Sequence, residues 1–269
     1  MDRVEGLLTF FILNFFITRY NPKSQLNIEL IIIYIIYMKL NFLYTHSFRR
    51  IILYIGLDHI IWGKINLVRV VITIPAYNEA KTISKVIRSI PRDIAEDVKI
   101  LVLDDGSGDN TADVAYEAGA DIVVSHIHNL GLAASYRDML EIATEEMNAD
   151  ILVNIDADGQ YEPKEIPKLI KPILNHEADI VLGSRFDGYI EKMKWSKKFG
   201  NKVATKIVSR AAGQKFSDCQ TGFRAITRDV AMRMNVSSDF TYTQESLVNA
   251  VHHNLKVVEV PVTFYKRED

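Results

Sequence analysis

Two aspartates separated by one residue, Asp156 and Asp158, are the side chains in this sequence best suited to chemistry. They follow residues 151–155, which are largely apolar, contain no glycine or proline, and predict a strand buried on both faces. Side chains alternate along an extended backbone, so both carboxylates project the same way. Mg²⁺ and Mn²⁺ prefer oxygen ligands and commonly combine one or two carboxylates with phosphate oxygens. The pair therefore predicts a divalent-cation site with Gln160 as a further oxygen ligand, and a simple Asp-Gly turn is the alternative.

Polar clusters also follow other predicted strands, and their residue types suit a nucleoside diphosphate. Tyr77 offers an aromatic face for a base or ribose, and Glu79 and Asp105 can accept hydrogen bonds from ring N–H groups or ribose hydroxyls. Arg185 can bridge phosphate oxygens. Simpler roles stay open at this stage. The stretch Asp104–Ser107 is typical of a turn with a helix cap, and Arg185 is also suited to a surface salt bridge.

The elements that position these residues alternate between strands and helices. Strands are predicted at residues 68–74, 98–103, 121–125, 151–155, 179–183, 223–227 and 257–264. Helices are predicted at residues 80–90, 111–117, 132–147, from 163, 195–212, from 229, and 243–253. We expect Asn110 or Thr111 to cap the second helix, and a kink or break near Pro172. This alternation predicts an α/β fold with a mainly parallel sheet, helices on both faces, and ligands bound at the carboxyl ends of the strands.

Composition excludes several classes of protein. The chain has 269 residues and a formal net charge of −2, so it carries no global basic field, and we expect no nucleic-acid partner. Its single cysteine, Cys219, has no partner for an intramolecular disulfide. Neither Gly-x-Gly-x-x-Gly nor Gly-x-x-x-x-Gly-Lys-Ser/Thr is present, which argues against a dinucleotide site and a P-loop. His126 and His128 lack further ligands around them in the sequence, so we do not predict zinc there.

Residues 1–66 differ from the rest of the chain in their high content of Ile, Leu, Phe, Tyr and Asn. Their apolar runs are interrupted before they reach the roughly 20 residues that a membrane-spanning helix needs. Three interpretations remain: a membrane-associating helical lead, a poorly ordered extension, or sequence upstream of a translation start near Leu67. Residues 67–269 have the composition and size of an ordinary α/β domain, and we expect the part from Val68 onward to fold alone.

Six motifs, in this order, resemble those of family 2 glycosyltransferases with the Rossmann-like GT-A fold. They are Pro75–Glu79, Asp104–Ser107, Asn129–Leu132, Asp156–Gln160, Gly183–Phe186 and Asp218–Arg224. Within that family, residues 68–267 look most like the polyprenyl-phosphate sugar synthases of the dolichyl-phosphate mannosyltransferase type. The resemblance implies an enzyme at the cytoplasmic face of a membrane, held there peripherally or through its N-terminal section. It also implies a nucleotide-diphosphate sugar (GDP-mannose or a UDP-sugar) as donor and a polyprenyl or dolichyl phosphate as acceptor.

The same resemblance implies roles for individual residues. The residues that would hold the nucleoside are Pro75, Tyr77, Glu79, Leu103 and Asp105. The Asp-x-Asp element on the diphosphate and metal would be Asp156, Ala157 and Asp158, with Gln160 as a further metal ligand. Three arginines would bind phosphate groups or the acceptor: Arg185, Arg224 and Arg267. Relatives continue past the position of Asp269 through a Gly-x-Ser-Lys segment with a phosphate-binding lysine.

The implied reaction is an in-line displacement at the anomeric carbon with inversion, in which Mg²⁺ or Mn²⁺ neutralises the leaving nucleoside diphosphate. A lipid phosphate is largely dianionic at neutral pH and needs no strong base, and we expect Arg185, Arg224 and Arg267 to form an anion site for it. A sugar hydroxyl would need a carboxylate base. Asp218 is the candidate, and bracing of its own loop is the alternative role.

Other functions are compatible with parts of this pattern. The acceptor can instead be a saccharide or another soluble molecule. A nucleotidyltransferase shares the metal carboxylates, but the sequence lacks the glycine-rich basic loop expected after its first strand. A non-enzymatic, truncated homologue that only binds nucleotide sugars is a third reading.

Overall fold

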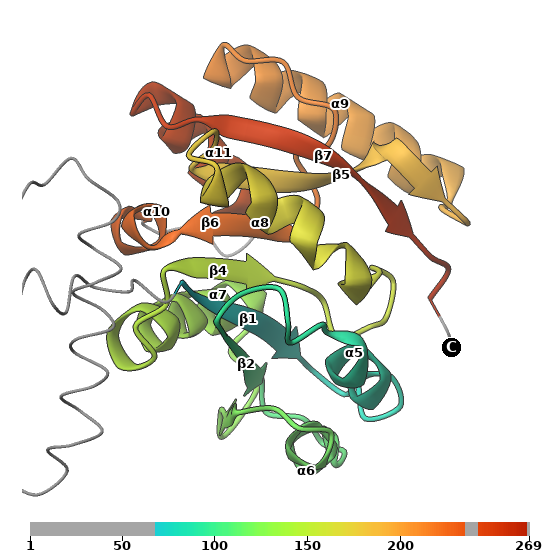
Figure 1. Cartoon of the computed structure of the whole chain (residues 1–269). Coiled ribbons are helices and arrows are strands. Elements are labelled where there is room, and N and C mark those ends of the chain that lie inside the picture. The colour runs from blue at the N-terminus through green and yellow to red at the C-terminus, as the bar shows by residue number, and fades with distance from the viewer. Residues whose placement is uncertain (1–67, 235–241, 268–269) are drawn as a thin grey trace, which may run out of the picture. The chain divides into compact units, whose positions relative to one another are not determined.

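A seven-stranded sheet organises residues 68–234 and 242–267, which the computed structural model describes (Figure 1). Its order is β3 (Ile122–Ser125), β2 (Asp97–Asp104), β1 (Arg69–Ala76), β4 (Ile151–Asn154), β6 (Arg224–Thr227), β5 (Ile180–Ile190) and β7 (Val257–Phe264). Neighbouring strands are parallel except in the two pairs that involve β6, which runs antiparallel to both β4 and β5. The predicted mainly parallel sheet is confirmed, with one reversed strand that the alternation of elements did not indicate.

Helices cover both faces of this sheet. One face packs against α5 (Ile83–Ser89), α6 (Thr111–Glu117) and α8 (Ile166–Leu174). The other packs against α7 (Leu132–Glu141), α9 (Trp195–Ala212), α10 (Arg228–Arg233) and α11 (Tyr242–His252). A π-helical turn, Ile142–Glu146, continues α7, and a 3₁₀ turn, Pro163–Glu165, precedes α8. In the described part of the chain, no helix is both long and apolar enough to cross a bilayer.

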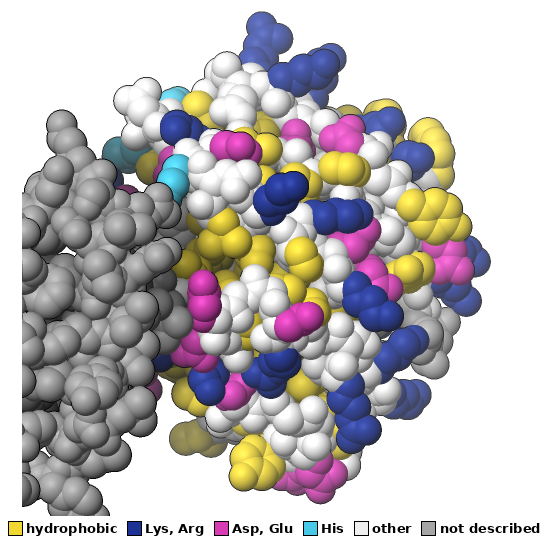
Figure 2. All heavy atoms as spheres, in the orientation of Figure 1, with side chains coloured by type: hydrophobic (Ala, Val, Ile, Leu, Met, Phe, Trp, Pro, Cys, Tyr) yellow, Lys and Arg dark blue, Asp and Glu magenta, His cyan; other side chains and the backbone are white. Residues whose placement is uncertain are grey.

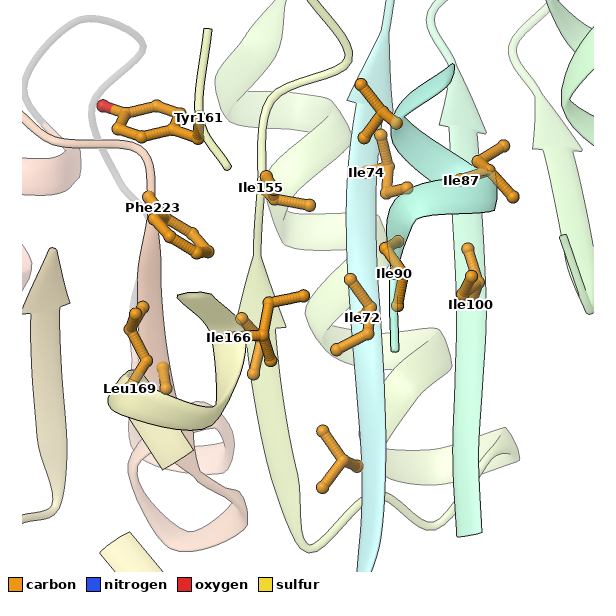
Figure 3. Packing of buried hydrophobic residues seen from close by; sticks show 14 of the residues in the cluster. Ile72, Ile74, Ile87, Ile90, Ile100, Ile155, Tyr161, Ile166, Leu169 and Phe223 are labelled. Carbon is orange, nitrogen blue, oxygen red and sulfur yellow. The ribbon is translucent and has the colours of Figure 1, made fainter. Parts of the chain in front are cut away.

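Side-chain alternation along the strands builds two hydrophobic cores, one on each face. In β1, Ile72 and Ile74 belong to the core beneath α5 and α8, whereas Val71 belongs to the core on the opposite face. Figure 3 shows the first of these cores, where Ile72 and Ile74 pack near Ile87 of α5 and Ile166 of α8. Strands buried on both faces explain the almost continuous apolar runs in the sequence. The carboxyl ends of β1, β2 and β4 meet at one edge, so the polar loops that follow them lie close together.

The helix at 195–212 and the strand at 257–264 match their predictions to the residue. Other elements differ at their ends. The first helix begins at Ile83, and β5 continues to Ile190 through the motif that was expected to follow it. Neither Asn110 nor Thr111 caps α6 with its side chain; instead, Asp109 Oδ1 accepts a hydrogen bond from the Thr111 N–H at 3.1 Å. Helix α8 runs through Pro172 and ends at Leu174. The interpretations of residues 1–66 lie outside the described residues.

We predict that residues 68–269 fold without the N-terminal section, because the two cores described above are complete within residues 70–264. Circular dichroism and thermal unfolding of this fragment should show a cooperative transition. An Ile72→Ala fragment serves as a destabilised reference. Its side chain is fully buried, so truncation should lower the free energy of unfolding by about 2–5 kcal/mol. An unfolded fragment would contradict the prediction.

Candidate active site

Asp156 lies directly after β4 as a half-buried carboxylate without a hydrogen-bond donor among the described residues. Burial, and next the negative charge of Asp158, raise its pKa to about 6, while the charges of Arg185, Arg224 and Lys197 act in the opposite direction. Asp158 accepts a hydrogen bond from the backbone N–H of Gln160 at 3.0 Å. Two carboxylates, one without a hydrogen-bond partner and reluctant to ionise, form a donor set that fits a divalent cation.

The protein ligands for such a cation are few. The described residues contain no group of three or more His, Cys, Asp or Glu side chains placed to hold a metal. This suits Mg²⁺ or Mn²⁺ bound by one or two carboxylates with substrate phosphates completing the shell. The side-chain amide of Gln160 donates to the carbonyl of Tyr265 at 3.1 Å, which ties the loop after β4 to the chain after β7. The assignment of Asp156, Asp158 and Gln160 as metal ligands stays a prediction.

Gly222 is placed against the carboxylate of Asp156, a contact that the sequence did not reveal. A Cβ atom added at Gly222 would stand 2.7 Å from Asp156 Oδ1 and 2.8 Å from Oδ2. The Gly222 carbonyl accepts a hydrogen bond from Asn154 Nδ2 at 2.8 Å, and Asn154 is the last residue of β4. Because of this anchor, the loop before β6 holds its backbone against the carboxylate, and a side chain at position 222 would have to displace that carboxylate.

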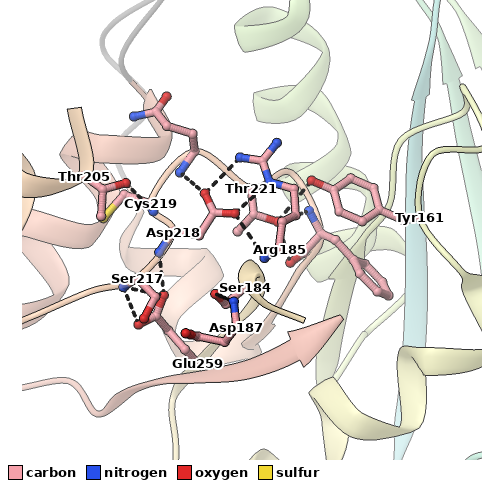
Figure 4. A network of polar contacts seen from close by, with 12 residues as sticks. Tyr161, Ser184, Arg185, Asp187, Thr205, Ser217, Asp218, Cys219, Thr221 and Glu259 are labelled. Carbon is pink, nitrogen blue, oxygen red and sulfur yellow. Dashed lines mark hydrogen bonds and ion pairs between the residues drawn. The ribbon is translucent and has the colours of Figure 1, made fainter. Parts of the chain in front are cut away.

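Arg185 of β5 and Asp218 of the same loop form a buried ion pair (Figure 4). The guanidinium donates to Asp218 through Nε at 2.6 Å and Nη2 at 2.8 Å, and the Arg185 backbone N–H donates to Oδ2 at 3.1 Å. Glu259 of β7 holds the same loop by accepting hydrogen bonds from the backbone N–H groups of Ser217 and Asp218. Burial raises the pKa of Glu259, while these two N–H donors act to lower it.

This pairing corrects two expectations. Arg185 is 4% exposed, and its guanidinium is paired with Asp218, so in this structure it is neither a free phosphate ligand nor part of a surface salt bridge. Asp218 has no exposed surface and already accepts several hydrogen bonds, which favours the bracing role over that of a general base. The guanidinium also lies over the ring of Phe264, 5.2 Å from its centroid, so β7 holds it as well.

The three arginines expected to form one anion site lie in different surroundings. Arg224 is 2% exposed and donates to the Thr221 carbonyl at 2.6 Å. Its charge and that of Arg185 both act on Asp156 from within the protein. Arg267 is about half exposed and pairs with Glu79, so two residues 188 positions apart that were both predicted to bind the nucleotide sugar do meet. Arg185 and Arg224 are thus buried and act on Asp156, whereas Arg267 is half exposed and pairs with Glu79, and a joint anion site of the three stays a prediction.

The residues predicted to hold the nucleoside surround the loops after β1 and β2. Tyr77 is 49% exposed, as a stacking platform requires. Pro75 lies in β1 opposite Leu103 of β2. The side chains of Leu103 and Ala157 are buried in the hydrophobic cores, so only their backbone atoms are available to a ligand.

Two hydrogen bonds join these loops. The Asn78 N–H donates to Ser107 Oγ, and the Gly108 N–H donates to Asn78 Oδ1, each at 2.8 Å.

A pocket of about 420 Å³ opens beside the loop that follows β4. Its wall includes Gly159 and Tyr161 from the segment after β4, residues of α5, and Tyr265 to Arg267 at the end of the described chain. Because Arg267 also pairs with Glu79, the pocket adjoins the predicted nucleotide-binding residues. The edge of the sheet thus carries two neighbouring carboxylates, an exposed aromatic side chain and an adjacent cavity.

Sequence reasoning missed four residues that shape this site: His126, Lys197, Gly222 and Glu259. Gly222 lay inside a motif, but its contact with Asp156 joins positions far apart in the chain. Glu259 lay in a predicted strand without a visible partner. Lys197 was one of many lysines, although its charge acts on Asp156. His126 was considered only as a zinc ligand.

Known proteins are similar to this chain in sequence and in fold. Residues 71–234 match the family model described as glycosyl transferase family 2. The UDP-N-acetylglucosamine–dolichyl-phosphate N-acetylglucosaminyltransferase of Methanococcus voltae is 31% identical over 210 residues, covering 70% of this chain and 82% of that protein. The polyprenol monophosphomannose synthase of Mycolicibacterium smegmatis is 29% identical over 211 residues, covering 74% of this chain and 78% of that protein.

A solved structure shares the fold. It is glucosyl-3-phosphoglycerate synthase from Mycobacterium tuberculosis in complex with Mn²⁺, uridine diphosphate and phosphoglyceric acid, with a TM-score of 0.60, 22% identity, and coverage of 74% of this chain and 72% of that one.

We predict that Asp156→Asn stabilises the metal-free protein at neutral pH. The folded-state pKa of Asp156, about 6, lies above its ordinary value of 3.8, so wild-type stability falls as pH rises between these values. At about 1.4 kcal/mol per pKa unit, the variant should gain at most about 3 kcal/mol near pH 7 and nothing near pH 4.

Urea unfolding at both pH values checks this prediction. Asp121→Asn is the control of opposite sign: burial acts to raise the pKa of Asp121, but its bonds from Arg92, the Ile100 N–H and Lys99 together lower it. Added Mn²⁺ should raise the melting temperature of the wild type and not that of Asp156→Asn. Equal metal stabilisation of both proteins would exclude Asp156 as a ligand.

Gly222→Ala should displace the Asp156 carboxylate, because a Cβ atom would overlap both of its oxygens. We expect Mn²⁺-dependent nucleotide affinity, measured by calorimetry, to fall about tenfold or more, as for the loss of one charge-assisted ligand. Gly200→Ala in α9 is the matched control, since no atom lies within 4 Å of its added Cβ. Unchanged affinity in Gly222→Ala would show that the position of Asp156 does not matter for binding.

Proposed function

The chain belongs to glycosyl transferase family 2, and from this premise we propose that it transfers a hexose from a nucleotide-diphosphate sugar to a polyprenyl phosphate at a membrane surface. The reaction would depend on Mg²⁺ or Mn²⁺. Relatives named as dolichyl-phosphate and polyprenol-phosphate enzymes support the acceptor, and the fold relative crystallised with Mn²⁺ and uridine diphosphate supports the metal and the type of donor.

The surface of α9 is the observation that most directly supports a lipid as the acceptor. Four apolar side chains at intervals of four residues are exposed along this helix: Trp195 77%, Phe199 57%, Val203 44% and Ile207 65%. Trp195 and Phe199 stack with their ring centroids 5.5 Å apart. A basic residue follows each of the four three positions later, and all four are exposed: Lys198, Lys202, Lys206 and Arg210. Figure 2 shows basic and hydrophobic side chains interspersed along the upper right edge, where α9 lies in Figure 1.

A row of exposed aromatic and aliphatic side chains beside a row of cations suits the surface of an anionic membrane. Such a helix lies in the interface with its apolar side chains among the acyl chains, while each nearby cation contributes about 1 kcal/mol of attraction. No acidic residue interrupts α9. Lys197 on the same helix acts electrostatically on Asp156, so α9 borders both the proposed lipid surface and the candidate metal site.

The chemistry of the residues also favours a phosphate acceptor. A phosphate monoester with a second pKa near 6 is already nucleophilic at neutral pH, whereas a sugar hydroxyl needs a base. Asp218, the carboxylate considered for that role, is bound to Arg185. The bound cation would supply neutralisation of the leaving diphosphate. Tyr77 and Asp105 would hold the nucleoside, and Lys197 would attract the acceptor phosphate so that it attacks the anomeric carbon in line, with inversion.

Transfer of label between phases tests the proposal. The full-length protein is incubated with labelled UDP- and GDP-sugars, anionic vesicles that contain polyprenyl phosphate, and Mn²⁺ or a chelator. Label should enter the chloroform–methanol phase only with metal and polyprenyl phosphate. Label in a water-soluble glycoside would favour a soluble acceptor, as in the phosphoglycerate-bound relative. Nucleotide binding without any transfer would favour the binding-only reading.

Variants of α9 separate membrane docking from chemistry. A Trp195→Ser/Phe199→Ser protein should bind anionic vesicles about tenfold or more weakly in sedimentation, because both aromatic side chains are lost from the interface. Its apparent KM for polyprenyl phosphate should rise, while the KM for the sugar nucleotide should not change. Tyr116→Ser, which removes an aromatic side chain that is 71% exposed on α6, is the control. Equal vesicle binding by both variants and the wild type would count against α9 as the docking surface.

A further inference from the structure

His126 is held between two carboxylates at the end of β3. Its Nδ1 lies 2.7 Å from Asp105 Oδ1, and its Nε2 lies 2.9 Å from Asp138 Oδ2. The imidazole side chain is only 11% exposed, and its backbone N–H donates to the Asp104 carbonyl at 2.9 Å. The ring therefore joins three segments: the end of β3, the loop after β2 that carries Asp105, and helix α7 that carries Asp138.

This geometry requires both ring nitrogens to donate. A neutral imidazole carries one N–H, so its other nitrogen would direct a lone pair at a carboxylate; an imidazolium donates from both. The charged groups that act on the ring are these two carboxylates, one from each element packed against it. Burial lowers the pKa of His126, but the bonds to Asp105 and Asp138 outweigh burial and raise it above its ordinary value of 6.5.

We call the arrangement of His126 between Asp105 and Asp138 the His126 clasp. Asp105 belongs both to this clasp and to the proposed nucleotide site. Its side chain is 7% exposed and accepts backbone hydrogen bonds from Leu130 and Gly131, each at 2.9 Å. Gly131 has φ of 91° and immediately precedes α7. Asp105 Oδ2 accepts only the Gly131 bond among the described residues and so keeps a lone pair for a ribose hydroxyl or a base N–H.

We propose that protonated His126 is a positioning residue that fixes Asp105 for the nucleoside of the donor and makes donor affinity depend on one proton. The inference rests on the proposed binding of a nucleotide sugar. His126 itself touches neither substrate nor metal; it acts through Asp105. When the ring loses its proton, one of the two carboxylates loses its donor and faces a lone pair, so the clasp that fixes Asp105 weakens and the nucleoside is held less firmly.

The sign of the pH dependence follows from the raised pKa. The contribution of the clasp is fully present below the ordinary His pKa of 6.5 and is lost as pH rises through the higher folded-state pKa of His126. Donor affinity should therefore fall as pH rises above 6.5 through that pKa. Ionisation of the nucleotide itself occurs equally with every variant, so it cancels in a comparison between proteins.

Calorimetry of UDP and GDP with Mn²⁺, from about pH 6 to about pH 9, tests the proposal on the full-length protein. Over this range the wild-type Kd should rise about tenfold more than the Kd of His126→Gln. That variant should bind the nucleotides weakly at every pH, and its affinity should not depend on this proton. Asp138→Asn keeps an acceptor oxygen but removes one charge, so its midpoint should move to lower pH. His128→Gln, an exposed histidine of the same loop, should behave as the wild type.

Proton NMR of the histidine rings, with His126 assigned by its loss in His126→Gln, gives a second readout. Its midpoint should lie above 6.5 and should fall in Asp138→Asn. A midpoint at or below 6.5, or equal pH profiles in the wild type and in Asp138→Asn, would overturn the inference, and the latter test stands even if His126→Gln does not fold. Failure of the wild type to bind either nucleotide at any pH would instead overturn the proposed function and this inference together.

Discussion

A negative charge at the carboxyl end of β4 is the constraint on which the rest of the site depends. Burial and Asp158 push the Asp156 carboxylate toward its protonated form, and two buried arginines oppose them. One of these, Arg185, is itself fixed by Asp218, whose loop is held by Glu259 of β7. Removing one partner of such a buried pair would leave an uncompensated charge, which typically costs about 3–5 kcal/mol. The position of one carboxylate therefore depends on segments from β4 to β7.

The reversed strand β6 makes this arrangement possible. A parallel strand would deliver its amino end to the opposite edge of the sheet, far from the carboxyl end of β4. Because β6 is antiparallel, its first residue, Arg224, pairs with Asn154, the last residue of β4. The loop that precedes β6 consequently lies beside Asp156, and this loop carries both Gly222 and Asp218. The long crossover through α9 leads into the same loop, which explains how a lysine of α9 comes to act on the site.

Local patterns in the sequence predicted the alternating strands and helices of a mainly parallel sheet, but not the reversed direction of β6. Residues 151–155 predicted a buried strand, and Asp156 was correctly placed at its end, because alternation and strand-end chemistry are properties of neighbouring residues. Arg185 was recognised as important, but its partner stands 33 positions away, so no local pattern distinguished a phosphate ligand from a buried ion pair. The antiparallel direction of β6 and the contact of Gly222 with Asp156 arise from tertiary packing. The His126 clasp likewise joins residues 21 and 12 positions apart, beyond the reach of spacing rules.

Charge balance provides an independent argument for metal dependence. A donor diphosphate, an acceptor phosphate, Asp156 and Asp158 would all be anionic in one cleft. The nearby cations are already engaged in part: Arg185 by Asp218, and Arg267 by Glu79. Burial and the charge of Asp158 raise the pKa of Asp156 even though the charges of Arg185, Arg224 and Lys197 act to lower it. A divalent cation held by Asp156 and Asp158 would offset the charge of the carboxylates and of the leaving diphosphate, so binding of the donor and binding of the metal should each strengthen the other.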